Sequence, residues 1–107
     1  MSAVELQALV AHEMGHDYFW SEYQQARERR DLRTLREVEL KCDGIAALTL
    51  VALGLAPTAL VSAERKVRRF NETRNAVANA DAYPSSSARE RFIRDVILLR
   101  AQRGANP

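Results

Sequence analysis

Apolar residues in the middle of the chain recur at helical spacing. Leu32, Leu35, Val38, Cys42 and Ile45 follow one another at steps of three or four residues, the period of one face of an α-helix. No segment alternates apolar and polar residues over four or more positions, so we expect no β-strand. The sequence therefore predicts an all-α protein. Its 107 residues, of which 47% are apolar, are enough for a single domain, residues 1–107, with a modest core.

Local start and stop signals divide the chain into about four predicted helices. The first extends from about Ala3 to Tyr18, because Ser2 and Glu5 form a capping box and the aromatic segment YFWSEY ends it. The second is predicted to build through the charged stretch ARERRDLRTLREVE. It ends near Leu53, just before a glycine and a proline.

The second half of the chain predicts two further helices. One opens at Pro57 and Thr58 and reaches about Phe70. The polar segment NETRNAVANADAYPSSS that follows is rich in turn-forming residues and is predicted to be irregular. The last helix begins at Ser87, which forms a second capping box with Glu90, and the terminal RGANP is predicted to be a frayed tail.

Charge and cysteine content narrow the class of protein. The 16 basic and 14 acidic residues are interleaved, as on a solvated helix surface, so we expect no nucleic-acid partner. The longest apolar run, IAALTLVALGLA, is shorter than the about 20 residues that a membrane span needs. Cys42 is the only cysteine, which makes an intrachain disulfide impossible, and the N-terminus lacks a signal-peptide pattern. We therefore expect a cytoplasmic protein.

The segment HEMGH, from His12 to His16, is the strongest indication of a functional site in the sequence. Residues four apart share one face of a helix, so both imidazoles can bind one metal ion, and zinc suits such a site. Glu13 lies on a neighbouring face and is predicted to act as a general base on a metal-bound water. Gly15 costs a helix about 1 kcal/mol relative to alanine, which indicates a close approach by another element. The alternative is two histidines on a solvated surface.

The segment ELKCD supplies candidates for a third ligand. Glu39 and Asp43 are four apart, so Glu39 can complete a two-histidine, one-glutamate site while Asp43 accepts a hydrogen bond from a ligating histidine. Apolar residues follow, which indicates burial, and buried carboxylates need partners. Loss of the metal is therefore expected to leave Glu39 and Asp43 buried without a partner. The alternatives are two acids on a solvated face, or Glu37 as the ligand, although Glu37 lies on the opposite side of the helix.

Three segments, LVAHEMGH, ELKCDGIAALTLVALGLAPTALVSAE and AYPSSSARERF, together resemble the gluzincin zinc metallopeptidases. The resemblance is to the CAAX prenyl endopeptidase and HtpX-like group and to the small minigluzincins, and it covers roughly residues 5 to 97. It implies that His12, His16 and Glu39 bind Zn²⁺, that Glu13 polarises the catalytic water, and that Asp43 supports a ligand. It also implies a peptide or protein substrate.

The chain departs from that family at three points. Cys42 stands where alanine is usual, and we interpret it as a small buried residue rather than a thiolate ligand. Tyr83 replaces a histidine and is either an oxyanion stabiliser or, slightly favoured, a packed aromatic. The family's β-sheet lies upstream, but this chain begins about ten residues before His12. We therefore expect the sheet to be absent, and the chain to be a fragment, a minimal domain, or a protein whose partner supplies the substrate-binding strands.

Two functions follow from these features. The leading hypothesis is a zinc-dependent metalloendopeptidase. The alternative is a non-catalytic helical zinc-binding module that binds a partner protein. The intact Glu13 favours catalysis, because a structural site has no use for a base there, whereas the short region before His12 favours the binding module.

Overall fold

The computed structural model describes residues 1–73 and 83–105 and is all-α in that part, with no strand. It contains five helices: α1 (Ala3–Tyr18), α2 (Trp20–Glu28), α3 (Leu32–Ala52), α4 (Thr58–Thr73) and α5 (Ser86–Ala105). The predicted fold class is therefore confirmed. The prediction of about four helices is wrong, because the predicted second helix is two helices, α2 and α3.

The division between α2 and α3 occurs within the charged stretch. Arg30 adopts a left-handed conformation, with φ at 56°, and this interrupts the helical hydrogen-bond ladder. Asp31 then caps α3, because its carboxylate accepts a hydrogen bond from the Thr34 backbone N–H at 3.1 Å. Neither glycine nor proline marks this break, so the usual stop signals did not reveal it.

The other helix ends mostly follow the sequence signals. The capping box of Ser2 and Glu5 is present at the start of α1, and Gly54, with φ at 73°, follows the end of α3. The cap of α5 was predicted two residues too late. Ser85, rather than Ser87, accepts the hydrogen bond from the Ala88 N–H. The predicted tail is partly helical, since α5 continues to Ala105. Most of the predicted irregular segment, residues 74–82, lies outside the described residues.

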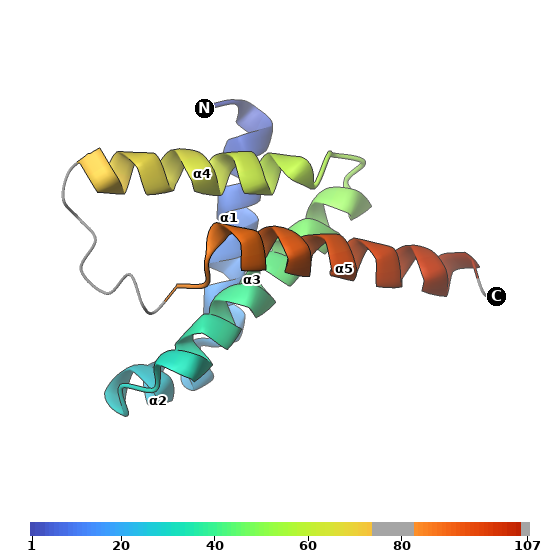
Figure 1. Ribbon diagram of the computed structural model, residues 1–107. Helices are drawn as coiled ribbons and strands as arrows, with labels where there is room; N and C mark the ends of the chain where they lie inside the picture. Colours follow the sequence, from blue (N-terminus) through green and yellow to red (C-terminus); the bar gives the residue numbers. More distant parts are fainter. Residues whose placement is uncertain (74–82, 106–107) are drawn as a thin grey trace.

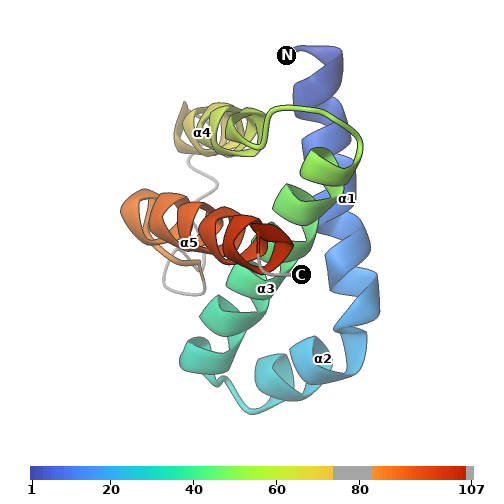
Figure 2. The ribbon, with the colours of Figure 1, turned by 90° about the vertical axis from the view of Figure 1, so that its right-hand side faces the viewer.

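The helices form two layers. In Figure 1, α1 and α3 cross behind α4 and α5, and Figure 2 shows the same two pairs on opposite sides of the molecule. The layers meet at a small core that consists largely of alanine and a few larger residues: Ala8, Ala11, Ala46, Ala47, Leu50, Leu60 and Ile93. Small side chains allow α1 and α3 to approach closely, and this close approach sets the geometry of the site described below.

No helix in the described part of the chain combines the length and the apolar character needed to cross a membrane.

Candidate metal centre

The two histidines of HEMGH face α3 from consecutive turns of α1. His12 is buried and His16 is partly buried, and their ring centroids are 5.1 Å apart. Gly15, between them, makes the close approach that the sequence predicts. A Cβ atom at this position would lie 3.0 Å from Cys42 Cα on α3. The missing side chain therefore allows the histidines to reach α3.

Glu39 lies between the two imidazoles. One carboxylate oxygen is 3.0 Å from His12 Nε2 and the other is 2.8 Å from His16 Nε2. Burial alone would raise the pKa of Glu39, but its contacts with the two histidines lower it to about 2. Glu39 is therefore ionised, and its side chain is only 6% exposed.

Asp43 holds the opposite edge of the His12 ring. Its Oδ1 is 2.8 Å from His12 Nδ1, which is the hydrogen bond expected from the sequence. Burial alone would lower the pKa of His12, but hydrogen bonding to Asp43 and Glu39 raises it to about 9. Without a metal, His12 is thus a cation between two carboxylates. A metal at Nε2 would displace a proton while Asp43 kept the ring orientation.

Arg89 of α5 is the main residue that the sequence analysis missed. Its Nε and Nη2 donate to the two carboxylate oxygens of Asp43 at 2.8 and 2.9 Å, a bidentate geometry that lysine cannot reproduce. Burial alone would lower the pKa of Arg89, but Asp43 raises it. The guanidinium therefore stays charged and holds Asp43 in place.

Glu64 of α4 was also missed, and it lies beside Arg89. Arg89 Nη2 is 2.5 Å from Glu64 Oε2, yet neither carboxyl oxygen of Glu64 makes a well-directed hydrogen bond within the described residues. Burial raises the pKa of Glu64 to about 8, an effect that Arg89 opposes and Asp43 reinforces. Arg89 thus contacts both Asp43 and Glu64, and burial disfavours the charged form of the Glu64 carboxyl.

Cys42 is buried directly beneath α1, as expected for a small core residue. Its sulfur nevertheless lies close to the histidines, since one potential ligand atom each from His12, His16 and Cys42 all fall within 4.8 Å of one another. Burial raises the pKa of the thiol to about 12, and the neighbouring Glu39 adds to the rise. Without a metal the thiol therefore stays protonated, whereas a bound metal ion would favour the thiolate.

The remaining predicted site residues lie at the rim. Glu13 is exposed on α1, next to the buried His12 in the chain. Tyr83 is 50% exposed, and partial burial, together with the charge of Glu39, raises its pKa. Glu37 is exposed and pairs with Arg33 at 3.3 Å, so it points away from the histidines and is not the competing ligand.

The donor types of His12, His16 and Glu39, two imidazoles and a carboxylate, are ones that zinc accepts. In a tetrahedral site with zinc–nitrogen bonds of about 2.0–2.1 Å, neighbouring ligand atoms lie about 3.3 Å apart. The oxygens of Glu39 lie 3.0 and 2.8 Å from the two Nε2 atoms, close to that separation. The two distances belong to different oxygens of Glu39, so side chains would have to move for one of its oxygens to bind an ion together with both imidazoles.

The comparisons with known proteins neither support nor oppose this assignment. No protein-family model, no curated protein and no solved structure matches the chain.

Proposed function

We propose that the protein is a zinc-dependent metalloendopeptidase whose zinc ligands are His12, His16 and Glu39. The observation that carries the proposal is the position of Glu39, which contacts both histidines of HEMGH from another helix. A buried carboxylate shared by two imidazoles is the arrangement that a two-histidine, one-glutamate site requires. The resemblance of the sequence to gluzincin peptidases supports the same assignment.

Four further residues have roles in this proposal. Zinc would supply a Lewis acid that polarises the peptide carbonyl and makes water a stronger nucleophile. Glu13, exposed beside the histidines, takes the proton from the attacking water and passes it to the leaving amine. Asp43 and Arg89 keep His12 oriented. In the same proposal Tyr83, which is half exposed, donates its hydroxyl hydrogen to the oxyanion.

The substrate in this proposal is a peptide or protein, and a partner or further segment supplies the strands that bind it. Three large apolar side chains repeat at every fourth position along this helix and are more than half exposed: Leu6 at 54%, Val10 at 59% and Met14 at 64%. This apolar face points away from the histidine face of α1, and an exposed face of this kind is a surface that a partner or further segment would cover. A cytoplasmic location belongs to the same proposal.

Glu13→Gln tests catalysis separately from metal binding. Glutamine has nearly the same shape as glutamate, so zinc content should stay at about one ion per chain, as in the wild type. Cleavage of an unfolded protein substrate should fall by about 10²–10⁴, because the general base is lost. The control variant, His16→Ala with Glu39→Ala, should lose both zinc and cleavage. Equal cleavage by the wild type and Glu13→Gln would show that the activity does not use this base.

A second candidate function is a non-catalytic zinc module that binds a partner protein, and the position of Cys42 favours it. A thiolate close to both histidines would close the coordination sphere as a fourth ligand and leave no position for water. Cobalt substitution distinguishes the two candidates, because thiolate ligation gives a strong charge-transfer absorption near the ultraviolet. If Cys42→Ala removes that absorption and wild-type protein does not cleave, the binding module is the better description.

A further inference from the structure

The charges of the chain are unevenly divided between its two halves. Residues 1–54 carry six basic and nine acidic residues, whereas residues 55–107 carry ten basic and five acidic residues. The second half contains α4 and α5, which form one layer of the fold. The net charge of +2 therefore conceals a basic layer that packs on an acidic one.

A hollow of about 490 Å³ lies between α4 and α5. The two helices run side by side in opposite directions (Figures 1 and 2). Apolar side chains from both helices line the hollow: Val61 from α4, and Ile93 and Ile97 from α5. Ile93 is buried, while Val61 and Ile97 are partly accessible. The volume of the hollow lies within the range of about 300–1,000 Å³ that is typical of ligand sites.

Basic side chains surround the apolar floor of the hollow, which Val61, Ile93 and Ile97 form. Four basic residues and one acidic residue line the hollow: Arg65, Lys66, Arg69 and Arg94, with Glu90. Two of the cations have carboxylate partners, because Arg65 contacts Glu90 across the hollow and Lys66 contacts Glu5 of α1. The structure records no acidic partner, among the residues it describes, for the exposed side chains of Arg69 and Arg94. The rim therefore keeps two uncompensated positive charges, one from each helix.

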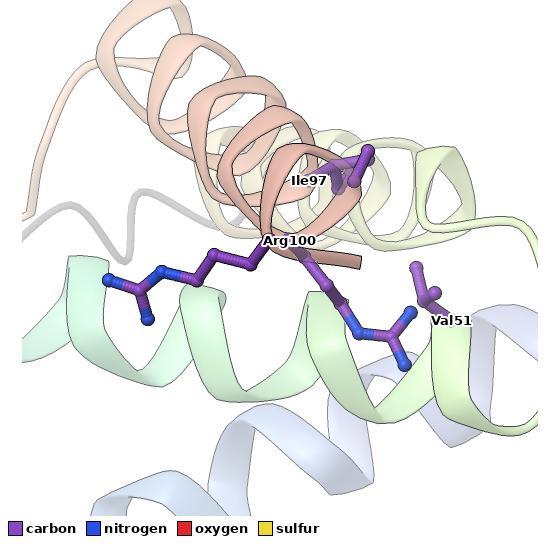
Figure 3. Close-up of a pocket in the computed structure, with 5 residues that line it drawn as sticks. Val51, Ile97 and Arg100 are labelled. Carbon is purple, nitrogen blue, oxygen red and sulfur yellow. The ribbon is translucent and has the colours of Figure 1, made fainter. Parts of the chain in front are cut away.

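A second hollow of about 540 Å³ lies between α5 and α3. Ile97 lines both, and Val51 of α3 forms the opposite wall of the second. Figure 3 shows Ile97 and Arg100 on α5 and Val51 on α3 around this space. Arg100 and Arg103 line it as well and add two more cations. Both hollows thus combine apolar side chains with a basic rim.

We propose that this groove binds an acidic, amphipathic helical segment of a partner protein. Between Thr58 and Arg69, the lining of α4 extends over about 16 Å, at 1.5 Å per residue, which matches three turns of a bound helix. Apolar side chains of the partner would contact Val61, Ile93 and Ile97, while its carboxylates would pair with Arg69 and Arg94. The groove is separate from the metal centre, and its occupation does not require zinc.

An apolar floor distinguishes this occupant from nucleic acid. A phosphate backbone gains from cations but has no apolar stripe to bury, and nucleic-acid grooves usually add aromatic side chains on which bases stack. The described lining of both hollows contains no aromatic residue. Charge and apolar surface together favour a peptide.

Fluorescence anisotropy with a synthetic peptide tests the proposal. The probe is a labelled peptide of about 14 residues, made of glutamate with leucine at the i, i+3, i+4 and i+7 positions of one helix face. It should bind the wild-type chain, and its affinity should fall with added salt. Arg69→Glu with Arg94→Glu should weaken binding by at least about tenfold, because two attractive pairs become repulsive.

Two controls separate groove binding from general charge. Arg27→Glu with Arg33→Glu makes the same change in net charge at exposed positions of α2 and α3 and should leave the affinity within about twofold. A probe with serine in place of leucine keeps the charge and should bind at least about tenfold more weakly. Thermal melting of each variant verifies that the fold is kept.

Several results would overturn the proposal. These are equal loss of binding in both double variants, equal binding of the leucine and serine probes, or tighter binding of a duplex DNA of similar charge. Sedimentation of the chain without the peptide measures its oligomeric state as a further test. A dimer that Arg69→Glu with Arg94→Glu dissociates would assign the groove to a second copy of this chain instead.

Discussion

At the scale of single residues, Arg89 determines how the buried carboxylates are held. It contacts Asp43 through two nitrogens, and Asp43 in turn contacts His12. The side chain of Asp43 is fully buried, so loss of its cation would leave a charge with only one partner. Removing one member of a buried ion pair is far more costly than removing an exposed charge.

Arg89→Gln should therefore lower the free energy of unfolding by about 3 kcal/mol. Zinc affinity should also fall by about 10–100-fold, because the group that orients His12 is loosened. Arg91→Gln is the matched control, since Arg91 lies on the same helix but is exposed, and it should change stability by less than about 0.5 kcal/mol. Denaturant unfolding and zinc titration measure both quantities. Equal behaviour of the two variants would contradict the role given to Arg89.

The ligand candidates were predictable from sequence because they form local pairs. His12 with His16, and Glu39 with Asp43, share helix faces at a spacing of four, so each pair is visible without a fold. Arg89 and Glu64 depend on packing between helices. A weaker signal was present, since Arg89 lies four residues before Ile93 on the apolar face of α5. Glu64 similarly lies four residues after Leu60.

At the scale of helices, the sequence predicted where most of them begin and end, but it missed the break between α2 and α3. That break relies on a non-glycine residue, Arg30, in the left-handed region. Such a conformation is disfavoured for arginine on its own. A backbone hydrogen bond from the Asp31 N–H to the Ala26 carbonyl at 2.9 Å closes the end of α2 around Arg30, as in a Schellman motif. Glycine usually occupies the left-handed position of this motif, so an arginine there gave no recognisable signal.

Close packing of α1 on α3 leaves little room for a side chain at position 15. In Gly15→Ala, better helix propensity contributes about 1 kcal/mol, but the new methyl group would meet the Cys42 backbone at 3.0 Å, and overpacking costs about 1–3 kcal/mol. We expect a net loss of up to about 2 kcal/mol and weaker zinc binding. Gly44→Ala is the comparison, because its methyl group would meet the edge of the Phe92 ring, which can rotate away, at 3.2 Å. Thermal melting of both variants measures the difference, and a more stable Gly15→Ala would refute the close contact.

A polar contact joins α1 to α4 and makes stability depend on pH. Lys66 donates to Glu5 at 2.9 Å and Ser62 donates at 2.8 Å. The contact with Lys66, followed by the backbone N–H of Ser2, lowers the pKa of Glu5 from its ordinary value of 4.5 to about 2. A lowered pKa stabilises the fold above the unfolded value, and the contribution is lost as the pH falls from 4.5 to about 2.

Glu5→Gln should consequently reduce stability at pH 7 and flatten its decline between pH 4.5 and about 2. Glu28→Gln, at an exposed position on α2, should leave the pH profile unchanged. Urea unfolding at a series of pH values gives both profiles. Parallel profiles for wild type and Glu5→Gln would show that the contact with Lys66 does not contribute.

At the scale of the whole molecule, four helices meet at one polar cluster. His12 and His16 come from α1, Glu39 and Asp43 from α3, Glu64 from α4 and Arg89 from α5. The apolar core beside it is small and consists largely of alanine. The cluster therefore both defines the candidate function and joins the two layers of the fold.

The structure corrects one expectation about this cluster. The sequence suggested that loss of the metal would leave Glu39 and Asp43 buried without partners. Instead, Glu39 contacts both histidines and Asp43 contacts Arg89 and His12. With a pKa of about 9, His12 carries a positive charge at pH 7 and takes over part of the role of the metal. These contacts would give both carboxylates partners in the absence of an ion.

Removal of zinc should accordingly lower the melting temperature without abolishing cooperative unfolding. A metal present at about 1,000 times its dissociation constant contributes about 4 kcal/mol, and each kcal/mol shifts the midpoint of a domain of this size by about 4–8 °C. We therefore expect a decrease of more than about 10 °C in the presence of a chelator. His16→Ala with Glu39→Ala should melt at the same temperature with and without chelator. An unchanged wild-type midpoint, with zinc shown to be gone, would argue against a metal between α1 and α3. Loss of the cooperative transition would show that contacts with Arg89 and His12 cannot replace the ion.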